Sequence, residues 1–397
     1  RSEQTIEINA YGRSFQFVLV PNELRAANYR AVETGTSGDR EMGRGEIITY
    51  KGKLSGDEAS EIRFTITENK IEGLIYTGER DKFFVTLAEN FSSQAPENLG
   101  VVYREEDLLK TVDLSHDVPA SQSVLEEQFK LESGLIPPST QNATAVPENG
   151  YRAVEVATEA DFQWVTQAGG AAAANNEILG ILNLVDGIYK RDLNLSIVVT
   201  FQHAWSSSDP FSSASTSAEL DSFLSYWNSN YPRTSYPRDT AHLFTGKFSN
   251  QGIAYQGIMC RSPNYSYGIT ARSGSVNHLI AAHEIGHNLG ADHVANTGAC
   301  ATSLMNPSLT YGATAFCETS RAQVAAYVAA NGSCLTTATG GTTPTPTPTP
   351  TLTPTPTPSC TYSITPSSQN FGSAGGTGSL SISTQSGCGW SVTSNQF

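Results

Sequence analysis

The residues with the clearest capacity for chemistry lie in one short segment, HEIGHNLGADH at positions 283–293, which matches the pattern HExxHxxGxxH. Residues four apart share one face of a helix, so a helix here would bring His283 and His287 within reach of a single ion. Gly290 can take the left-handed conformation that ends a helix, so that the chain turns and His293 returns as a third nitrogen ligand. Three imidazoles leave one position open for water, which predicts a catalytic zinc site.

Glu284 directly follows the first of these histidines. Zinc lowers the pKa of a bound water, and a neighbouring carboxylate takes a proton from that water and hands it to a leaving amine. We therefore predict that Glu284 is the general base of peptide-bond hydrolysis. A structural histidine cluster or an inactive zinc-binding relative is the alternative. Four further histidines stand alone in the sequence and are expected to be surface or locally hydrogen-bonded residues: His116, His203, His242 and His278.

The elements that must position this segment follow from the spacing of apolar residues between positions 151 and 337. The pattern predicts two strands and four helices, at 153–156 and 195–200 and at 173–193, 217–229, 276–289 and 321–330. Strands and helices mixed in this order indicate a layered α/β domain. The helix at 276–289 carries the first two histidines.

The rest of the chain divides at changes in composition. Residues 1–135 are β-rich, with strands expected at 14–20, 61–66, 72–76 and 83–87, and predict a small antiparallel domain. Turn-forming residues at 136–150 predict a linker where cleavage would separate two folded units. The Thr-Pro alternation within 338–359 predicts an extended spacer. Residues 360–397 carry short alternating runs typical of a partial β-sandwich.

Composition excludes several classes of protein. A chain of 397 residues predicts two or three domains. Its 38 acidic and 24 basic residues give a net charge of −14, without the basic cluster that nucleic acid requires. No apolar stretch is long enough for a membrane span. Six cysteines without a CxxC pair favour disulfides, and we expect a soluble, secreted protein from which any leader has been removed.

Taken together, these motifs resemble the metzincin zinc peptidases, in which a methionine-containing turn lies beneath the metal. Met305, twelve residues after His293, fits that turn. Over residues 151–337 the sequence is similar to the adamalysin/reprolysin group, the catalytic domains of snake-venom metalloproteinases and ADAM proteases. The likeness rests on RAVEV at 152–156, HLFTG at 242–246, GIAYQGIMC at 252–260, Asn288 and the closing helix. Val294 departs from the group's pattern, which has aspartate there.

This resemblance implies a mixed, twisted sheet with an active-site helix, and further site residues. It implies the disulfides Cys260–Cys334 and Cys300–Cys317. The positions matching the calcium carboxylates of some members are Glu155 and Asp239, although Thr337 replaces the family's asparagine. The alternative is that Glu155 and Asp239 are salt-bridged or solvated carboxylates. The substrate is expected to lie extended along 252–259, with a pocket near 305–309.

Residues 1–135 resemble the propeptide region that precedes reprolysin-like catalytic domains; an accessory domain is the alternative. No cysteine precedes Cys260, which excludes a thiol switch. The candidates for an oxygen or nitrogen ligand that would block zinc are Asp113, His116, Asp117 and Glu132. The segment 360–397 resembles the start of BACON-type bacterial β-sandwich modules, which implies glycan or mucin binding and pairs Cys360 with Cys388.

The sequence as a whole predicts a secreted, zinc-dependent endopeptidase. Such a hydrolase would act on proteins or peptides and would be made as a zymogen. The alternative is a zinc-binding scaffold in an adhesion or carbohydrate-binding protein with little peptidase activity.

Overall fold

A computed structural model gives the fold of this chain. It describes residues 4–67, 71–79, 81–88, 91–92, 94–96, 99–104, 107, 114–117, 150–309, 312–337, 362–365 and 381–384. The chain divides into two compact units, Arg1–Gly340 and Gly341–Phe397. In the described part of the second unit, β18 (Tyr362–Thr365) and β19 (Ser381–Thr384) form an antiparallel pair. The predicted Cys360–Cys388 disulfide and most of the predicted sandwich lie outside the described residues.

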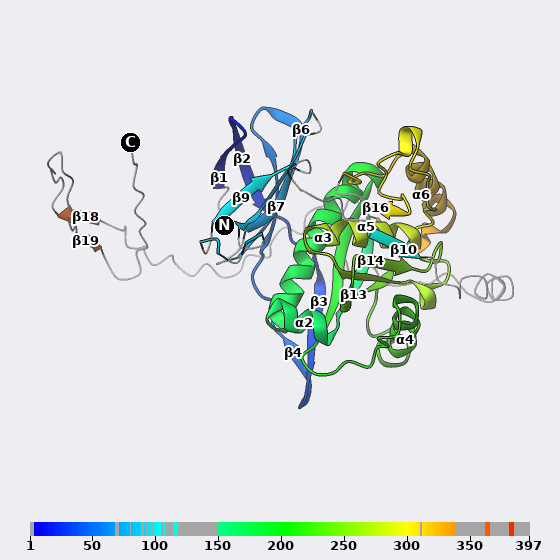
Figure 1. Cartoon of the computed structure of the whole chain (residues 1–397). Coiled ribbons are helices and arrows are strands. Elements are labelled where there is room, and N and C mark those ends of the chain that lie inside the picture. Colours follow the sequence, from blue (N-terminus) through cyan, green and yellow to red (C-terminus); the bar gives the residue numbers. More distant parts are fainter. Residues whose placement is uncertain are drawn as a thin grey trace, which may run out of the picture. The chain divides into compact units, whose positions relative to one another are not determined.

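The larger sheet of the first unit is the mixed sheet of an α/β domain (Figure 1). Its strands run in the order β16-β10-β14-β15-β13-β11-β12-β3-β4, with β17 (Thr336–Thr337) beside β11. The central strands β12, β11, β13 and β15 are parallel, and β14 is antiparallel to β15. These five strands are β11 (Arg152–Ala160), β12 (Leu195–Trp205), β13 (Thr240–Ser249), β14 (Gln251–Ala254) and β15 (Tyr267–Arg272).

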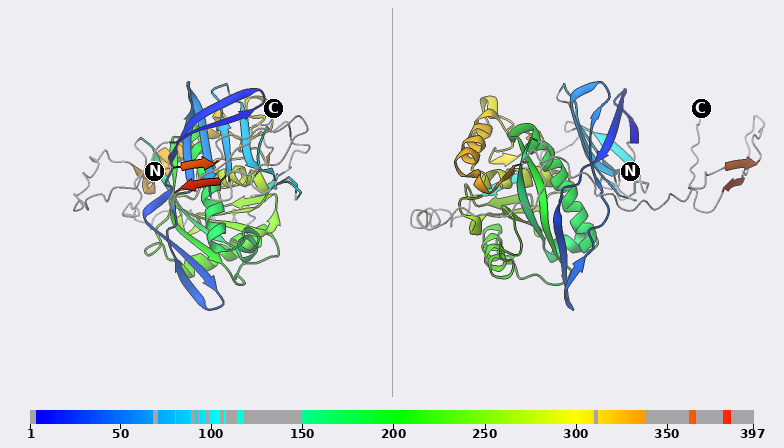
Figure 2. Two further views of the ribbon diagram at one scale, coloured as in Figure 1. Left: turned by 90° about the vertical axis from the view of Figure 1, so that its left-hand side faces the viewer. Right: turned by 180° about the vertical axis from the view of Figure 1, so that it is seen from behind.

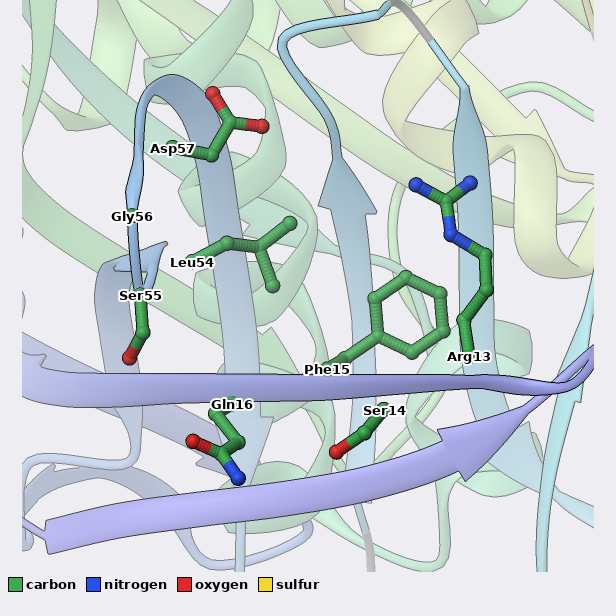
Figure 3. Close-up of a pocket in the computed structure, with 8 residues that line it drawn as sticks. All are labelled: Arg13, Ser14, Phe15, Gln16, Leu54, Ser55, Gly56 and Asp57. Atoms are coloured by element: carbon green, nitrogen blue, oxygen red, sulfur yellow. The ribbon is translucent and has the colours of Figure 1, made fainter.

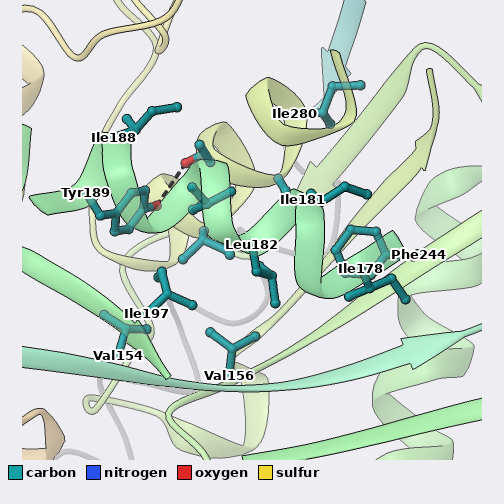
Figure 4. Packing of buried hydrophobic residues seen from close by; sticks show 14 of the residues in the cluster. Val154, Val156, Ile178, Ile181, Leu182, Ile188, Tyr189, Ile197, Phe244 and Ile280 are labelled. Carbon is teal, nitrogen blue, oxygen red and sulfur yellow. Dashed lines mark hydrogen bonds between the residues drawn. The ribbon is translucent and has the colours of Figure 1, made fainter. Parts of the chain in front are cut away.

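Helices cover both faces of this sheet, because the central strands are apolar on both sides. On one face, side chains of α3 and α5 pack with β11, β12 and β13, as Figure 4 shows around Ile178, Val156 and Phe244. On the other face, α4 packs through Phe223 and Trp227. The helices are α2 (Phe162–Ala168), α3 (Ala171–Leu193), α4 (Thr216–Asn230), α5 (Asn277–Asn288) and α6 (Glu318–Asn331).

All four predicted helices are present, with ends set by local capping. The Ser215 side chain caps α4 by accepting from the Ala218 N–H at 3.1 Å, and Asn194 ends α3 in the left-handed conformation. The short helix α2 was not predicted, because seven residues give too few apolar repeats to show a period. None of the helices in the described ranges is sufficiently long and apolar to span a membrane.

Residues 4–103 contribute a second, antiparallel sheet, as the sequence predicts. Its order is β1-β2-β5-β6-β7-β8-β9, and its core contains Phe15, Phe17, Phe64 and Phe83. A hollow of about 360 Å³ on β2 and the β5–β6 turn contains none of the predicted site residues (Figure 3). The strands are β1 (Gln4–Ala10), β2 (Arg13–Pro21), β5 (Thr49–Leu54), β6 (Asp57–Ile66), β7 (Ile71–Tyr76), β8 (Lys82–Leu87) and β9 (Gly100–Tyr103).

Three strands of the N-terminal region instead belong to the larger sheet. At one edge, β3 (Arg25–Gly35) is parallel to β12 and pairs on its other side with β4 (Gly38–Met42) (Figure 2). At the other edge, β10 (Leu114–Asp117) is parallel to β14 and antiparallel to β16 (Ser308–Leu309). The sequence analysis placed residues 1–135 in a unit apart from 151–337. Pairing between strands distant in sequence leaves no local signal, so this shared sheet could not be anticipated.

Polar contacts also join the N-terminal sheet to α3. The Arg63 guanidinium lies 2.7 Å from Asp186 Oδ2, and both side chains are buried. Asp186 pairs in addition with Lys190 at 3.0 Å. Gly187 permits this close approach, because a Cβ there would collide with the Glu61 carboxylate. The Arg63 and Lys190 charges hold the pKa of Asp186 below its usual range in spite of its burial.

Candidate metal centre and active site

Helix α5 brings the predicted ligands together. His283 and His287 are buried on consecutive turns of the helix. The Nε2 atom of His293 lies 3.1 Å from Nε2 of His283 and 3.1 Å from Nε2 of His287. The ligand atoms of all three lie within 4.8 Å of one another. The Nε2 atoms of the three imidazoles therefore converge on one point.

Hydrogen bonds at Nδ1 of His283 and His287 determine which nitrogen of each ring carries the proton. His283 Nδ1 lies 2.6 Å from the Leu304 carbonyl, and His287 Nδ1 lies 2.7 Å from the Ala291 carbonyl. A carbonyl only accepts, so in the neutral imidazole Nδ1 carries the proton and Nε2 presents a lone pair. Two lone pairs that converge with His293 Nε2 at 3.1 Å fit a cation between the three rings. Tetrahedral zinc places its nitrogen ligands about 3.3 Å apart, so the three histidines fit it.

Gly290 makes the turn that returns His293. It has φ +81°, and its N–H donates to the His287 carbonyl at 2.9 Å. The Ala291 N–H donates to the Gly286 carbonyl at 3.0 Å, which completes the helix end. A Cβ at 290 would also collide with the ring of Tyr327. Both the backbone conformation and the close approach therefore require glycine here.

Met305 lies buried below α5, where a Cβ on Gly286 would come within 3.1 Å of its sulfur. Its carbonyl accepts from the Val294 N–H at 2.9 Å, next to the third histidine. Asn306 Nδ2 donates to the Val294 carbonyl at 3.0 Å and to the Cys300 carbonyl at 2.9 Å. The turn around Met305 thus holds the segment that carries His293.

Both disulfides expected from the resemblance are present. Cys260 is bonded to Cys334, and Cys300 is bonded to Cys317. The first ties the loop after β14 to the end of α6, and the second closes the loop that contains Met305. They leave no free cysteine among the described residues.

Glu284 is fully buried beside the three histidines. The edge strand β14 approaches it so closely that a Cβ on Gly252 would collide with Glu284 Oε1 and with Ile280. On its other side, Tyr189 donates to the Ala282 carbonyl at 2.9 Å (Figure 4). Burial, with the nearby Glu284 charge, raises the pKa of Tyr189 well above its usual value. The Glu284 carboxylate on α5 therefore lies against the edge strand β14.

The strand expected at 252–259 is shorter in the structure. Strand β14 ends at Ala254, and the following residues bond to the end of α5 instead. The Gly257 N–H donates to the His287 carbonyl at 2.8 Å. Asn288 Nδ2 donates to the carbonyls of Tyr255 at 2.7 Å and Tyr267 at 3.1 Å. This positioning role of Asn288 was missed by residue-based reasoning, and its only sequence signal was the family pattern.

Three of the lone histidines are buried, so the surface alternative does not apply to His203, His242 and His278. His203 Nδ1 lies 2.5 Å from Glu159 Oε1 and His242 Nε2 lies 2.8 Å from Thr270 Oγ1, which agrees with the local hydrogen bonding expected. Burial lowers the pKa of His242 to about 3 and that of His278 to about 4. Apolar helices cover both faces of the sheet, and the sequence alone did not show that these residues lie beneath them.

The two carboxylates matched to a calcium site lie side by side, Glu155 on β11 and Asp239 directly before β13. Asp239 and Glu155 are buried, and Asp239 Oδ2 accepts from the Glu155 N–H at 2.8 Å. Burial raises the pKa of Asp239 to about 8, and the Glu155 charge adds to that shift. Two adjacent buried carboxylates suit a hard cation such as calcium.

Comparison with known proteins supports the assignment of this domain. Residues 154–338 match the family described as Reprolysin (M12B) family zinc metalloprotease. Two relatives from Gloydius brevicauda, the zinc metalloproteinase-disintegrin-like brevilysins H2a and H2b, are each 34% identical over 174 residues. Each match covers 41% of this chain and 40% of the relative, so the chain spans less than half of these proteins. Residues 154–338 are therefore similar to a zinc metalloprotease domain of the reprolysin (M12B) type.

Proposed function

We propose that this chain is a zinc-dependent endopeptidase in which His283, His287 and His293 hold the metal and Glu284 is the general base. The observation that carries the proposal is the convergence of three imidazole Nε2 atoms, two of them fixed through Nδ1–carbonyl bonds, beside a buried carboxylate. An intact Glu284 and the match to a zinc metalloprotease family argue against a zinc-binding scaffold.

Each group has a defined task in peptide hydrolysis. Zinc held by the three histidines would acidify a water and polarise the scissile carbonyl. Glu284 takes the proton from that water and delivers it to the leaving amine. The carbonyls of Leu304 and Ala291 keep the first two imidazoles in the tautomer that exposes Nε2. An extended substrate would pair its backbone with β14, and its side chain after the scissile bond would enter the region of Met305–Leu309.

Several finer assignments belong to this proposal. We propose a secreted, latent precursor in which residues 1–135 cover the active site and cleavage within 136–150 activates the enzyme. Glu155 and Asp239 are proposed to bind calcium, because the two buried carboxylates lie side by side. Residues 360–397 are proposed to be a partial BACON-type module for glycan or mucin, carried on the spacer at 338–359.

The decisive experiment is Glu284→Gln, which keeps the size and the metal ligands but removes the proton acceptor. Peptidase activity of the processed enzyme should fall by ~10²- to 10⁴-fold, which is the usual contribution of general-base catalysis. Zinc content should remain at one per chain. Glu318→Gln is the matched control, because Glu318 is exposed and pairs only with Arg321. Activity within tenfold of the parent would remove Glu284 from this role.

His293→Ala tests the ligand set. Loss of one of three protein nitrogens should weaken zinc binding, measured as zinc retained during mild chelation. Full retention would mean that the metal is held by other residues. Zinc that binds normally in a wild-type processed enzyme without turnover of casein or peptides would support the scaffold alternative.

A further inference from the structure

A cavity lies between the N-terminal antiparallel sheet and the helices of the catalytic domain. Its volume is about 760 Å³, within the range of about 300–1,000 Å³ that ligand pockets have. Strands β6, β7, β8 and β9 line it from the N-terminal region, and α2, α3, the end of β15 and the start of α5 line it from the catalytic domain. None of the predicted site residues lines this cavity, so it is separate from the metal centre.

The lining from the N-terminal region is aromatic. The rings of Phe84 and Tyr103 stack with their centroids 5.3 Å apart, and Phe91 meets Tyr103 edge-on at 5.1 Å. Leu184 of α3 packs against Phe84 and Tyr103. Phe91 is 55% exposed, so its ring is open to contact with a bound molecule. This wall therefore suits a ring-sized apolar group.

The lining from the catalytic domain includes two buried polar atoms that have no hydrogen-bond partner among the described residues, His278 Nε2 and Arg272 Nε. His278 is only 2% exposed, and the hydrogen bond between its ring and the Ser275 backbone uses the other nitrogen. Burial lowers the pKa of His278 to about 4, so the imidazole is neutral and Nε2 is an acceptor. Arg272 bonds Glu177 through its two terminal nitrogens, both at 2.8 Å, which balances its charge and leaves Nε as a donor.

We propose that this cavity binds a small, uncharged molecule that carries an aromatic ring and a hydroxyl group. The ring would lie against Phe84, Phe91 and Tyr103, and the hydroxyl would donate to His278 Nε2. The hydroxyl oxygen also has lone pairs that suit the Arg272 Nε donor. A buried acceptor without a partner costs free energy in the empty cavity, so a ligand that supplies the missing donor gains that free energy on binding.

The position of the cavity gives such a ligand a defined effect. Its lining comes from both the N-terminal sheet and α3, so the complete site exists only while the two are packed together. A bound molecule would therefore stabilise this packing by mass action. The inference goes beyond the proposed peptidase and does not depend on it, because binding is measured without turnover.

The first test measures binding of 3-phenylpropan-1-ol to the full chain by ligand-observed NMR and by calorimetry. A ligand of this size should bind with a Kd of about 1 mM or below. Its methyl ether keeps the ring and the oxygen acceptor but lacks the donor, and should bind about 5- to 10-fold more weakly. No binding of the alcohol, or equal binding of alcohol and ether, would overturn the proposal. Tighter binding of 3-phenylpropylamine would do so as well, because it would assign recognition to the carboxylate of Glu72 in the same lining.

The second test uses a matched pair of substitutions on α3. Ala172 and Ala173 are adjacent and exposed, but only Ala173 lines the cavity. Ala173→Phe should weaken binding of the alcohol by ~10-fold or more, because the new ring fills the space, whereas Ala172→Phe should bind like the parent. His278→Phe should remove the preference for the alcohol over its ether. Equal affinity in the two alanine variants would place the ligand elsewhere and overturn the proposal, even if His278→Phe does not fold.

Discussion

Strands of the N-terminal region lie near both ends of the larger sheet, and their pairings differ in extent. At the outer edge, β3 spans eleven residues, pairs with β12 and is flanked by β4. At the active-site edge, β10 spans four residues, of which three pair with β14. Both strands have a partner on each side, but β3 is a long strand, whereas β10 is a short ladder beside the candidate active site.

The side chains at the outer edge also belong to the hydrophobic core. At the outer edge, Leu24 and Val32 belong to the two main hydrophobic clusters of the catalytic domain. Thr34 Oγ1 lies 2.8 Å from Nε2 of the buried His203, which is itself bonded to Glu159. One region of the chain therefore contributes a strand that is part of the core and another that lies where, under the proposed function, a substrate would pair with β14. Loss of the first should affect stability, and loss of the second should affect activity.

The largest effect on stability is expected from Arg63→Met, which removes the partner of a fully buried Asp186. Breaking a buried ion pair from one side costs about 3–5 kcal/mol, and the remaining Lys190 places this case at the lower end. Urea unfolding of the full chain measures the change. The control is Arg13→Met, whose partner Asp81 is exposed, with an expected loss of about 1 kcal/mol or less. Equal losses of unfolding free energy in the two variants would mean that the buried Arg63–Asp186 pair stabilises the fold no more than an exposed pair.

A matched pair of prolines tests the two edges directly. Val32→Pro removes a backbone donor from an interior strand that has partners on both sides, and should reduce the unfolding free energy by about 2 kcal/mol or more. Ser115→Pro makes the same change in β10. It should leave the unfolding free energy within about 0.5 kcal/mol and raise turnover by the unprocessed chain. A reversed pattern would contradict the division between a structural and a displaceable strand.

Thr34→Val gives a smaller effect at the outer edge. It removes the hydroxyl that lies against His203 while conserving volume, and should cost about 1 kcal/mol in unfolding free energy. Thr166→Val is the control, because the Thr166 hydroxyl bonds only to the preceding helical turn, at the Phe162 carbonyl. If both variants unfold like the parent, the Thr34–His203 contact does not contribute to the stability of the sheet.

The smallest expected effect is the stabilisation of the folded chain by calcium binding at Asp239. Its pKa is raised to about 8, so the folded chain retains a proton that the unfolded chain loses near pH 4, and stability falls as the pH rises through that window. Calcium would replace the proton, so its stabilisation should be greater at pH 9 than at pH 5. At a calcium concentration equal to Kd the gain is ~0.4 kcal/mol. Thermal unfolding with and without calcium measures it, and Asp239→Asn should abolish the difference.

The sequence predicted the candidate metal ligands, which the structure brings together, because they are local. His283, His287, Gly290 and His293 lie in one segment, and helix periodicity with one left-handed turn suffices to bring the nitrogens together. The antiparallel N-terminal sheet and the four longer helices were also predicted, because the periodicity of apolar residues is local to each element. The disulfide pairs came from the family pattern, since cysteine spacing alone leaves the connectivity open.

Only the tertiary structure decided how the N-terminal region meets the catalytic domain. Neither β3 nor β10 carries a local mark of its partner, because a strand's pairing depends on which edge is free and on the apolar surface it covers. The burial of His203 and the ion pair of Arg63 with Asp186 depend on the same long-range packing. The sequence by itself therefore determined the candidate metal ligands, which are adjacent along the chain. The fold decided which strands of the N-terminal region pair with the larger sheet, because such pairing joins segments that are distant in sequence.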